Sequence, residues 1–239
     1  MANVAVVTGA SRGLGRVIAG FLAGQDFDLI LTGRDEAALA AAIAALSKNG
    51  ARVEGVAGNV ADHAHRKILA DIAARRGGID LLVNNASELG RTPLGPLAAY
   101  PIDKLDQVFA VNVFAPLALV QELLPLLQKR EGLVVNISSD AALGGYPGWG
   151  AYGASKAALD LISLTLANEL KDSGVTVISV DPSDMRTDMH QSAYAGEDIS
   201  DRPLPDVTIP FWAWLLSQDR AAISGRRFRA QADSWELGA

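Results

Sequence analysis

The segment Val4-Ala5-Val6-Val7-Thr8-Gly9-Ala10-Ser11-Arg12-Gly13-Leu14-Gly15 places a short apolar run directly before a glycine-rich turn, and a helical pattern over residues 16–23 follows. Strand, glycine-rich turn and helix in this order are typical of the first unit of a dinucleotide-binding domain. The glycines free the backbone for a tight turn and let a pyrophosphate approach the helix N-terminus, where free N–H groups and the helix dipole favour anions. Because the spacing is not G-x-G-x-x-G, a plain strand-to-helix turn is the alternative.

Apolar runs that predict buried strands alternate with helical patterns along the rest of the chain. The predicted strands cover residues 27–32, 52–57, 81–83, 133–137, 175–180 and 226–229; an alanine-rich helix ends near Asn49 and Gly50, and further helices cover residues 61–76, 102–129, 151–170 and 209–217. Such alternation implies a parallel sheet covered by helices on both faces. We therefore expect an α/β fold with a doubly wound parallel sheet of about seven strands, in a single domain over residues 1–239.

The composition is that of an ordinary globular chain. Of 239 residues, 49% are hydrophobic and 20% are charged, which is enough to bury one large core. The formal charge of −6 argues against nucleic acid or an anionic membrane as the main partner. The chain has no cysteine, which excludes disulfides and cysteine metal sites and fits a reducing compartment. Since residues 1–10 also lack the basic region of a signal peptide, we expect a cytoplasmic protein.

Two further features are interpreted as structural. The longest apolar region, residues 108–127, contains polar residues and two prolines, so it predicts a buried helix rather than a membrane span. His63 and His65 lie in a polar helical stretch beside Arg66 and Lys67, and we expect no metal site there.

Tyr152 and Lys156 are four residues apart in Tyr152-Gly153-Ala154-Ser155-Lys156, so on a helix they share one face. A phenol titrates near pH ~10 in a model peptide and is a poor acid or base near neutrality. An ammonium one turn away favours the phenolate, so we expect Lys156 to lower the pKa of Tyr152. The spacing suits an acid/base group, although a half-buried tyrosine beside a solvated lysine would give the same five residues.

Glycine or polar residues stand at the carboxyl ends of several predicted strands. They are the glycine turn, Arg34, Asn59, Asn85, Ser139 and Asp181-Pro182. Ligands of open α/β sheets bind beyond the carboxyl ends of the strands, so we expect these residues to line one site.

Taken together, these residues resemble the classical short-chain dehydrogenase/reductase (SDR) family, and the resemblance covers nearly the whole chain. The motifs occur here in the family's order as Thr8-Gly9-x-x-x-Gly13-x-Gly15, Asn84-Asn85-Ala86, Asn112, Ser139, Tyr152-x-x-x-Lys156 and Asp181-Pro182. No single motif is decisive, but their order and spacing together are specific. The resemblance implies a Rossmann-type fold and an oxidoreductase that transfers a hydride between nicotinamide and a carbonyl or secondary alcohol.

The resemblance also implies catalytic roles for Asn112, Ser139, Tyr152 and Lys156. In the direction of reduction, Tyr152 would donate a proton to the developing alkoxide, while Ser139 would polarise the carbonyl. Lys156 would lower the pKa of Tyr152 and hold the nicotinamide ribose. Asn112 would hold a water that joins Lys156 to solvent, with an internal packing amide as the alternative. Ser138 is the alternative to Ser139, whose spacing to Tyr152 matches the family better.

Cofactor contacts are assigned by the same resemblance. The expected cofactor-binding residues are Gly9, Ser11, Arg12, Gly13, Leu14, Gly15, Arg34, Asn59, Val60, Asn85, Ala86, Tyr152, Lys156, Pro182, Met185 and Thr187, and no metal is expected. Three residues depart from the family pattern: Ser87 and Ser183 stand where glycine is usual, and Asn59 stands where aspartate is usual. These departures bear on cofactor affinity and loop shape rather than on the reaction class.

The end of the second predicted strand bears on the choice between NADP(H) and NAD(H). NAD preference needs a carboxylate there, but the position holds Gly33, followed by Arg34, and Arg12 lies in the glycine turn. Guanidinium groups bind a 2′-phosphate through charge-assisted hydrogen bonds. We therefore expect NADP(H). Two alternatives stay open: Arg34 pairs with Asp35 or Glu36 in solvent, or Asp35 serves NAD(H).

The substrate, expected to be a small molecule, should bind between residues 143–149, 87–94 and 185–205. Leu143, Tyr146, Trp149, Met185 and Tyr194 would make this pocket apolar and aromatic, which suits a hydrophobic ketone, aldehyde or alcohol. Glu88, Arg91 and His190 could contact a polar substituent, but surface exposure is expected for each. A substrate-loop segment at about residues 186–206, bounded by glycine and proline, is expected to act as a mobile lid.

The predicted helices around residues 108–127 and 157–170 are apolar almost all round, which indicates burial on more than one side. In the family the matching helices pack against a second subunit, so a homodimer or homotetramer is expected, with a thickly covered monomer as the alternative. Two other functions stay open. One is a non-catalytic NADP(H)-sensing regulator on the same fold, against which the intact proton-donor set argues. The other is an epimerase or dehydratase, which generally needs a larger substrate-binding region.

Overall fold

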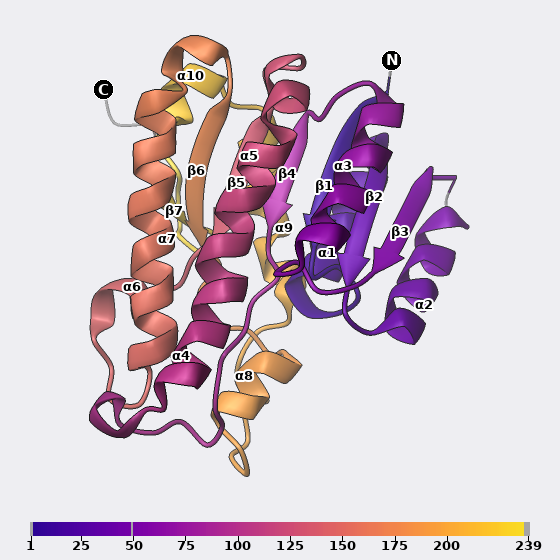
Figure 1. Cartoon of the computed structure of the whole chain (residues 1–239). Coiled ribbons are helices and arrows are strands. Elements are labelled where there is room, and N and C mark those ends of the chain that lie inside the picture. The colour runs from indigo at the N-terminus through magenta and orange to yellow at the C-terminus, as the bar shows by residue number, and fades with distance from the viewer. Residues whose placement is uncertain (1, 49, 237–239) are drawn as a thin grey trace.

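All seven strands run parallel, in the order β3-β2-β1-β4-β5-β6-β7 (Figure 1). The structure is a computed structural model that describes residues 2–48 and 50–236. The strands are β1 (Asn3–Thr8), β2 (Phe27–Gly33), β3 (Val53–Ala57), β4 (Leu81–Asn84), β5 (Leu133–Ile137), β6 (Thr176–Asp181) and β7 (Arg227–Arg229). The chain reverses its direction of travel across the sheet between β1 and β4, which is where such sheets open a ligand crevice. The Rossmann-type α/β fold expected from the sequence is confirmed.

Helices cover both faces of the sheet (Figure 1). One face carries α1 (Gly13–Ala23), α2 (Glu36–Ser47) and α9 (Ile209–Leu216); the other carries α3 (His63–Arg76), α4 (Ile102–Phe109), α5 (Ala115–Gln128) and α7 (Gly150–Glu169). The shorter elements are α6 (Ala141–Gly144), α8 (Asp188–Ala193), α10 (Arg220–Ile223), η1 (Leu97–Ala99), η2 (Ala110–Phe114), η3 (Lys171–Ser173) and η4 (Pro205–Thr208).

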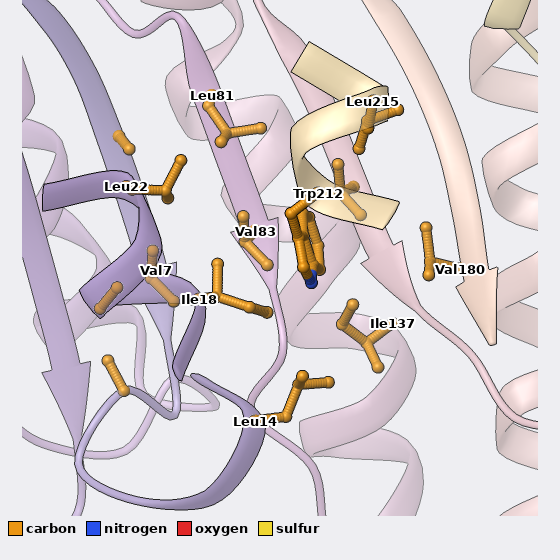
Figure 2. Close-up of a cluster of buried hydrophobic side chains, with 14 of the residues drawn as sticks. Val7, Leu14, Ile18, Leu22, Leu81, Val83, Ile137, Val180, Trp212 and Leu215 are labelled. Carbon is orange, nitrogen blue, oxygen red and sulfur yellow. The ribbon is translucent and has the colours of Figure 1, made fainter. Parts of the chain in front are cut away.

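The apolar strands supply side chains to two cores because successive residues of a strand point to opposite faces. Along β1, Ala5 and Val7 join the core beneath α1, α2 and α9, whereas Val4 and Val6 join the core beneath α3, α5 and α7. Figure 2 shows the first core, in which Trp212 lies between residues of α1 and side chains from the neighbouring strands. Burial on both faces explains why the central strands β1, β4 and β5 are almost continuously apolar.

The predicted strands and long helices are all present, with ends shifted by a few residues. The predicted helix over residues 102–129 is interrupted by η2, a π-helical turn that contains Asn112. The second helix ends at Ser47, and Asn49, near which the sequence placed its end, lies outside the described residues. By length and composition, the helix over residues 102–128 could cross a membrane, but half of its most apolar window is buried in this fold.

The two ends of the predicted substrate-loop segment lie next to each other. The backbone N–H of Arg186 donates to the carbonyl oxygen of Pro203 at 2.8 Å, so the two ends of the segment are joined. Between them, α8 lies below the carboxyl ends of the strands (Figure 1). Because the two ends of the segment are joined, α8 and its flanking residues can move over a ligand as one unit. The role of this segment as a lid stays a prediction.

Candidate active site

A cleft of about 660 Å³ lies at the carboxyl edge of the sheet. Most residues predicted for the site line it: Gly9, Ser11, Arg12, Gly13, Leu14, Arg34, Asn59, Val60, Asn85, Ala86, Ser139, Tyr152, Lys156, Pro182, Met185 and Thr187. Gly15 and Asn112 lie behind its wall. Parallel strands bring their carboxyl ends to one edge, and this is what assembles residues from distant parts of the chain.

The glycine turn is built around places where a side chain cannot fit. Gly9 has φ +66°, in the left-handed region that favours glycine. A Cβ on Gly15 would lie 2.4 Å from the carbonyl oxygen of Gly9 and 2.5 Å from Nδ2 of Asn85. Gly15 therefore allows α1 to pack closely against the glycine turn. It does not line the cleft, where a cofactor contact was expected.

Asn85 holds the glycine turn against the sheet. Its Nδ2 donates to the carbonyl oxygens of Thr8 at 2.9 Å and Gly9 at 3.2 Å. The Thr8 hydroxyl in turn accepts from the backbone N–H groups of Asn85 and Ala86, each at 2.9 Å. The Asn-Asn-Ala motif thus links the ends of β1 and β4, which fixes the floor of the cleft.

The start of α1 suits a pyrophosphate. Arg12 makes no side-chain cap and the first turn of the helix contains no acidic residue. A Cβ added to Gly13 would have its nearest neighbour, Thr187, at 3.6 Å, so there is space above the turn. Uncapped N–H groups, the positive end of the helix dipole and open space are what an anionic phosphate requires. The residues present therefore fit a dinucleotide.

Both arginines predicted to bind a 2′-phosphate are paired with carboxylates across the cleft. Nη1 of Arg34 lies 2.9 Å from Glu88, and Nη1 of Arg12 lies 3.1 Å from Asp188. The sequence suggested Asp35 or Glu36 as alternative partners of Arg34, but Asp35 instead caps α2 by accepting from the backbone N–H of Ala38. The expectation of surface exposure was wrong for Glu88, which is only partly exposed because it faces Arg34.

Asp35 also lines the cleft beside Arg34, but its Oδ1 is engaged with the backbone N–H of Ala38. A Cβ added to Gly33 would lie 3.0 Å from Oγ of Ser11, so even a small side chain there would displace the turn. Asn59 uses its Oδ1 to accept from the backbone N–H of Ala61 at 3.0 Å, which leaves its NH₂ group available.

Tyr152 and Lys156 lie one turn apart on α7, both buried against the cleft. Nζ of Lys156 donates to the carbonyl oxygen of Ile137 at 2.8 Å and lies 5.5 Å from the centroid of the Tyr152 ring. The hydroxyls of Ser139 and Ser87 lie near the phenol of Tyr152, where they act to lower its pKa. The structure thus brings Ser139, Tyr152 and Lys156 together, at the end of the cleft adjoining the glycine turn.

The expectation that Lys156 lowers the pKa of Tyr152 is wrong for this arrangement. Burial raises the pKa of Tyr152 to about 12, and this outweighs the opposite effect of the hydroxyls of Ser87 and Ser139. Burial also lowers the pKa of Lys156 to about 8, against the attraction of Asp160. The physical reason is that water is excluded from both groups, so each ionised form loses its solvation.

Asn112 is fully engaged within the protein. Its Oδ1 accepts from Ser87 Oγ at 3.1 Å and from the backbone N–H of Glu88 at 2.7 Å. Its Nδ2 donates to the carbonyl oxygen of Glu88 and to Ser155 Oγ, each at 2.9 Å. An amide side chain has no further hydrogen-bonding capacity beyond these contacts. The side chain therefore acts as an internal packing amide, and the predicted water would have to be held by other groups.

The two candidate serines are distinguished by their contacts. Ser139 contacts Tyr152, and its hydroxyl also donates to Asp140 at 3.1 Å. The Ser138 hydroxyl is buried and has no partner among the described residues. Ser139 is thus the serine in position to act with Tyr152, as the sequence favoured.

The substrate half of the cleft is aromatic. Trp149 packs edge-on against Tyr152 with ring centroids 5.8 Å apart, and lies 6.1 Å from Tyr194. His190, expected at the surface, is instead mostly buried because its ring stacks on Tyr194 at 4.9 Å. Leu143, expected in the pocket wall, is 75% exposed because α6 turns it away from the cleft.

The described residues contain no group of three or more histidine, cysteine, aspartate or glutamate side chains that could hold a metal ion. His65 is instead buried in a hydrogen bond of 2.7 Å with Thr32, and burial lowers its pKa. His63 lies 3.2 Å from Glu122.

Arg227 of β7 supports the site from behind and was not singled out by any sequence pattern. Its Nη2 donates to the carbonyl oxygen of Ser139 at 2.8 Å and lies 3.5 Å from the buried carboxylate of Asp181. Its Nε donates to Asp160 of α7 at 3.0 Å. One guanidinium thus ties together the ends of β5 and β6 and the helix that carries Tyr152. Its partners are 46 to 88 residues away along the chain, so only the fold reveals the contact.

Comparison with known proteins gives a consistent result. The family model described as short chain dehydrogenase matches residues 3–198. An uncharacterized oxidoreductase of Saccharomyces cerevisiae is 38% identical over 192 residues, covering 79% of this chain and 73% of its own. The L-xylo-3-hexulose reductase of Hypocrea jecorina is 32% identical over 254 residues, covering 98% of this chain and 82% of its own.

A solved structure shows the same fold. A short chain dehydrogenase from Shigella flexneri, complexed with NADP, superposes with a TM-score of 0.89 at 30% identity, covering 96% of this chain and 97% of its own.

Replacing Arg227 tests its support of the site. Arg227→Gln leaves the carboxylates of Asp160 and Asp181 without their cation, and we expect unfolding free energy to fall by about 2–3 kcal/mol, less than for a fully buried pair because the guanidinium is partly exposed. Urea denaturation followed by tryptophan fluorescence measures this. Arg226→Gln is the matched control because, within the described residues, the hydrogen bond of the Arg226 side chain goes to the carbonyl oxygen of Ala222 and to no carboxylate. Equal losses of unfolding free energy in Arg227→Gln and Arg226→Gln would contradict the supporting role assigned to Arg227.

Proposed function

Because this chain belongs to the short-chain dehydrogenase family of oxidoreductases, we propose that it is an NADP(H)-dependent enzyme that transfers a hydride between nicotinamide and a carbonyl or secondary-alcohol substrate. One observation carries the proposal. Tyr152 lies in the cleft that begins at the glycine turn, with Ser139 lining the same cleft and Lys156 one turn away on α7. An acid/base group, a polarising hydroxyl and a cation at the edge of a dinucleotide cleft are the groups that this reaction needs.

The cofactor would be held along the carboxyl edge of the sheet. The N-terminus of α1 would bind the pyrophosphate, Arg12 and Arg34 would bind the 2′-phosphate, and Lys156 would hold the nicotinamide ribose. When bound, the nicotinamide supplies the hydride for reduction and accepts it for oxidation. The NADP complex of the Shigella flexneri relative supports this choice of cofactor.

In reduction, Tyr152 donates its phenolic proton to the substrate oxygen while the carbonyl carbon gains the hydride, and the product is the alcohol. The pKa of about 12 supports the donor role because the phenol is then protonated at neutral pH. Ser139 stabilises the negative charge that develops on the oxygen. In oxidation the phenolate of Tyr152 must accept the proton of the alcohol. Because the pKa of Tyr152 is raised, the phenolate fraction is small at neutral pH, and the rate of oxidation increases as the pH rises.

The lining of the substrate half favours an uncharged, partly apolar substrate. The carboxylates of Asp140 and Asp184 line the cleft and would repel a carboxylate or phosphate, whereas Asp181 and Asp188 are paired with Arg227 and Arg12. Trp149 and the neighbouring aromatic rings offer apolar surface.

Replacing the tyrosine tests the reaction. Turnover of a panel of ketones, aldehydes and secondary alcohols is measured through NADPH consumption or NADP⁺ reduction. We expect Tyr152→Phe to lower kcat by at least ~10²-fold, since a positioned general acid contributes that much, while NADPH affinity stays within a few-fold. A non-catalytic NADP(H) sensor would instead bind NADPH, and neither the wild type nor Tyr152→Phe would turn over any member of the panel.

Replacing Arg34 tests the cofactor. Arg34→Ala removes a guanidinium available to the 2′-phosphate, so KM for NADPH should rise by roughly 10- to 100-fold while KM for NADH changes little. Steady-state kinetics with both cofactors measures the preference. Arg52→Ala is the control, because Arg52 is also mostly exposed but pairs with Asp28 outside the cleft. An unchanged preference in Arg34→Ala would remove the argument for NADP(H).

The same fold leaves an apolar face that supports assembly with a second copy. Helices α4, α5 and α7 lie side by side (Figure 1). Large apolar side chains are exposed along them: Ile102 of α4 at 69%, Phe114 of the intervening η2 at 59% and Leu161 of α7 at 66%. Exposed apolar surface of this kind commonly marks a protein interface. We therefore include a homodimer or homotetramer in the proposal.

Size-exclusion chromatography with light scattering measures this assembly. Leu161→Glu would bury a charge in the interface and should shift the protein toward the monomer. Ile68→Glu, at an exposed apolar position of α3, should leave the mass unchanged. A wild-type protein that is already monomeric would refute the proposal.

A further inference from the structure

Arg34 and Glu88 follow different strands but form one ion pair beside the cleft. Arg34 comes directly after β2 and Glu88 comes after the Asn-Asn-Ala motif at the end of β4, and β1 lies between these two strands in the sheet. Nη1 of Arg34 donates to Oε2 of Glu88 at 2.9 Å. The pair therefore spans the end of β1, where the glycine turn begins. A carboxylate thus already engages a guanidinium that we assign to the 2′-phosphate.

Glu88 is the fixed member of this pair. Its backbone N–H donates to Oδ1 of the buried Asn112 at 2.7 Å, and its carbonyl oxygen accepts from Nδ2 of Asn112 at 2.9 Å. Its second carboxylate oxygen, Oε1, accepts from the backbone N–H of Gly90 at 3.3 Å. The side chain of Glu88 is 28% exposed, whereas that of Arg34 is 59% exposed. The guanidinium can thus turn toward a ligand while the carboxylate stays in place.

We propose that Glu88 is a specificity-determining residue that competes with the 2′-phosphate of NADP(H) for Arg34. The inference rests on the proposed binding of the 2′-phosphate by Arg34. A phosphate that binds Nη1 must break the ion pair, and one that binds the remaining N–H groups of Arg34 lies close to a fixed negative charge. NAD(H) carries a hydroxyl in place of this phosphate and meets neither obstacle. Glu88 therefore narrows the preference for NADP(H) over NAD(H).

The contacts argue against the opposite role, in which Glu88 would orient Arg34 for the phosphate. Arg34 joins the pair through Nη1 and most of its side chain is exposed, so the bond gives the guanidinium little orientation. An exposed ion pair of this kind is weak because water and salt screen it. Repulsion between the fixed carboxylate and the phosphate remains after the ion pair is broken. Removal of the carboxylate should therefore favour the phosphate.

Isothermal titration calorimetry with two small nucleotides tests the competition without a substrate. Adenosine 2′,5′-bisphosphate and adenosine 5′-monophosphate differ only in the 2′-phosphate, so the ratio of their dissociation constants isolates its contribution. The variants are Glu88→Gln, which keeps an oxygen for the N–H of Gly90, and Glu88→Ala, which removes the carboxylate and its stem. Both substitutions retain the backbone groups that Asn112 binds.

We expect each Glu88 variant to bind the bisphosphate roughly two- to fivefold more tightly, which is the range for the loss of a partly exposed ion pair. Binding of the monophosphate should stay unchanged. Glu36→Gln is the matched control, because Glu36 is exposed in the first turn of α2, two residues from Arg34 in the chain, and does not line the cleft. In an Arg34→Ala background, Glu88→Gln should lose most of its effect, because the guanidinium for which the two anions compete is gone.

A ratio that is unchanged, or shifted toward the monophosphate, in both Glu88 variants overturns the inference. An equal gain in Glu36→Gln also overturns it, because that result would indicate a general effect of net charge. A gain that persists in full without Arg34 does the same. The proposed cofactor fails separately, if Arg34→Ala by itself leaves the ratio as it is in the wild type.

Discussion

The parallel direction of every strand is the constraint on which the site depends. It brings the carboxyl ends of β1, β4, β5 and β6 to one edge, so Thr8, Asn85, Ser139 and Asp181 meet although they are far apart along the chain. The direct bonds from Asn85 to the glycine turn then fix how closely two of these ends approach. The glycine turn and Tyr152 lie at the same edge because each follows the carboxyl end of a parallel strand.

Burial determines the acid/base character of the site more than charge does. Tyr152 and Lys156 both lie where water is excluded, and the pKa of each moves toward its neutral form. A phenol that stays protonated suits a proton donor, but it makes the phenolate costly. The hydroxyls of Ser139 and Ser87 oppose that cost because they lie near the phenol and act to lower its pKa. The balance between burial and these two hydroxyls sets the proton chemistry.

Two partly exposed ion pairs join separate segments of the chain beside the cleft. Arg12 contacts Asp188 on α8, and Arg34 contacts Glu88 beside the Asn-Asn-Ala motif. A phosphate that binds these guanidinium groups would compete with the carboxylates, so cofactor binding and the position of α8 are physically connected. Arg227 makes a comparable connection behind the site, from a strand beyond the region that the family model covers.

The sequence by itself determined the parallel α/β fold, the glycine turn and the set of Ser139, Tyr152 and Lys156. Periodicity, turn chemistry and motif spacing are local properties, so they can be read along the chain. Only the tertiary structure decided the direction of the Tyr152 pKa, the engagement of Asn112 and the contacts of Ser87, Glu88 and Arg227. Desolvation and long-range hydrogen bonds depend on what surrounds a group in space, and residues distant along the chain supply those surroundings.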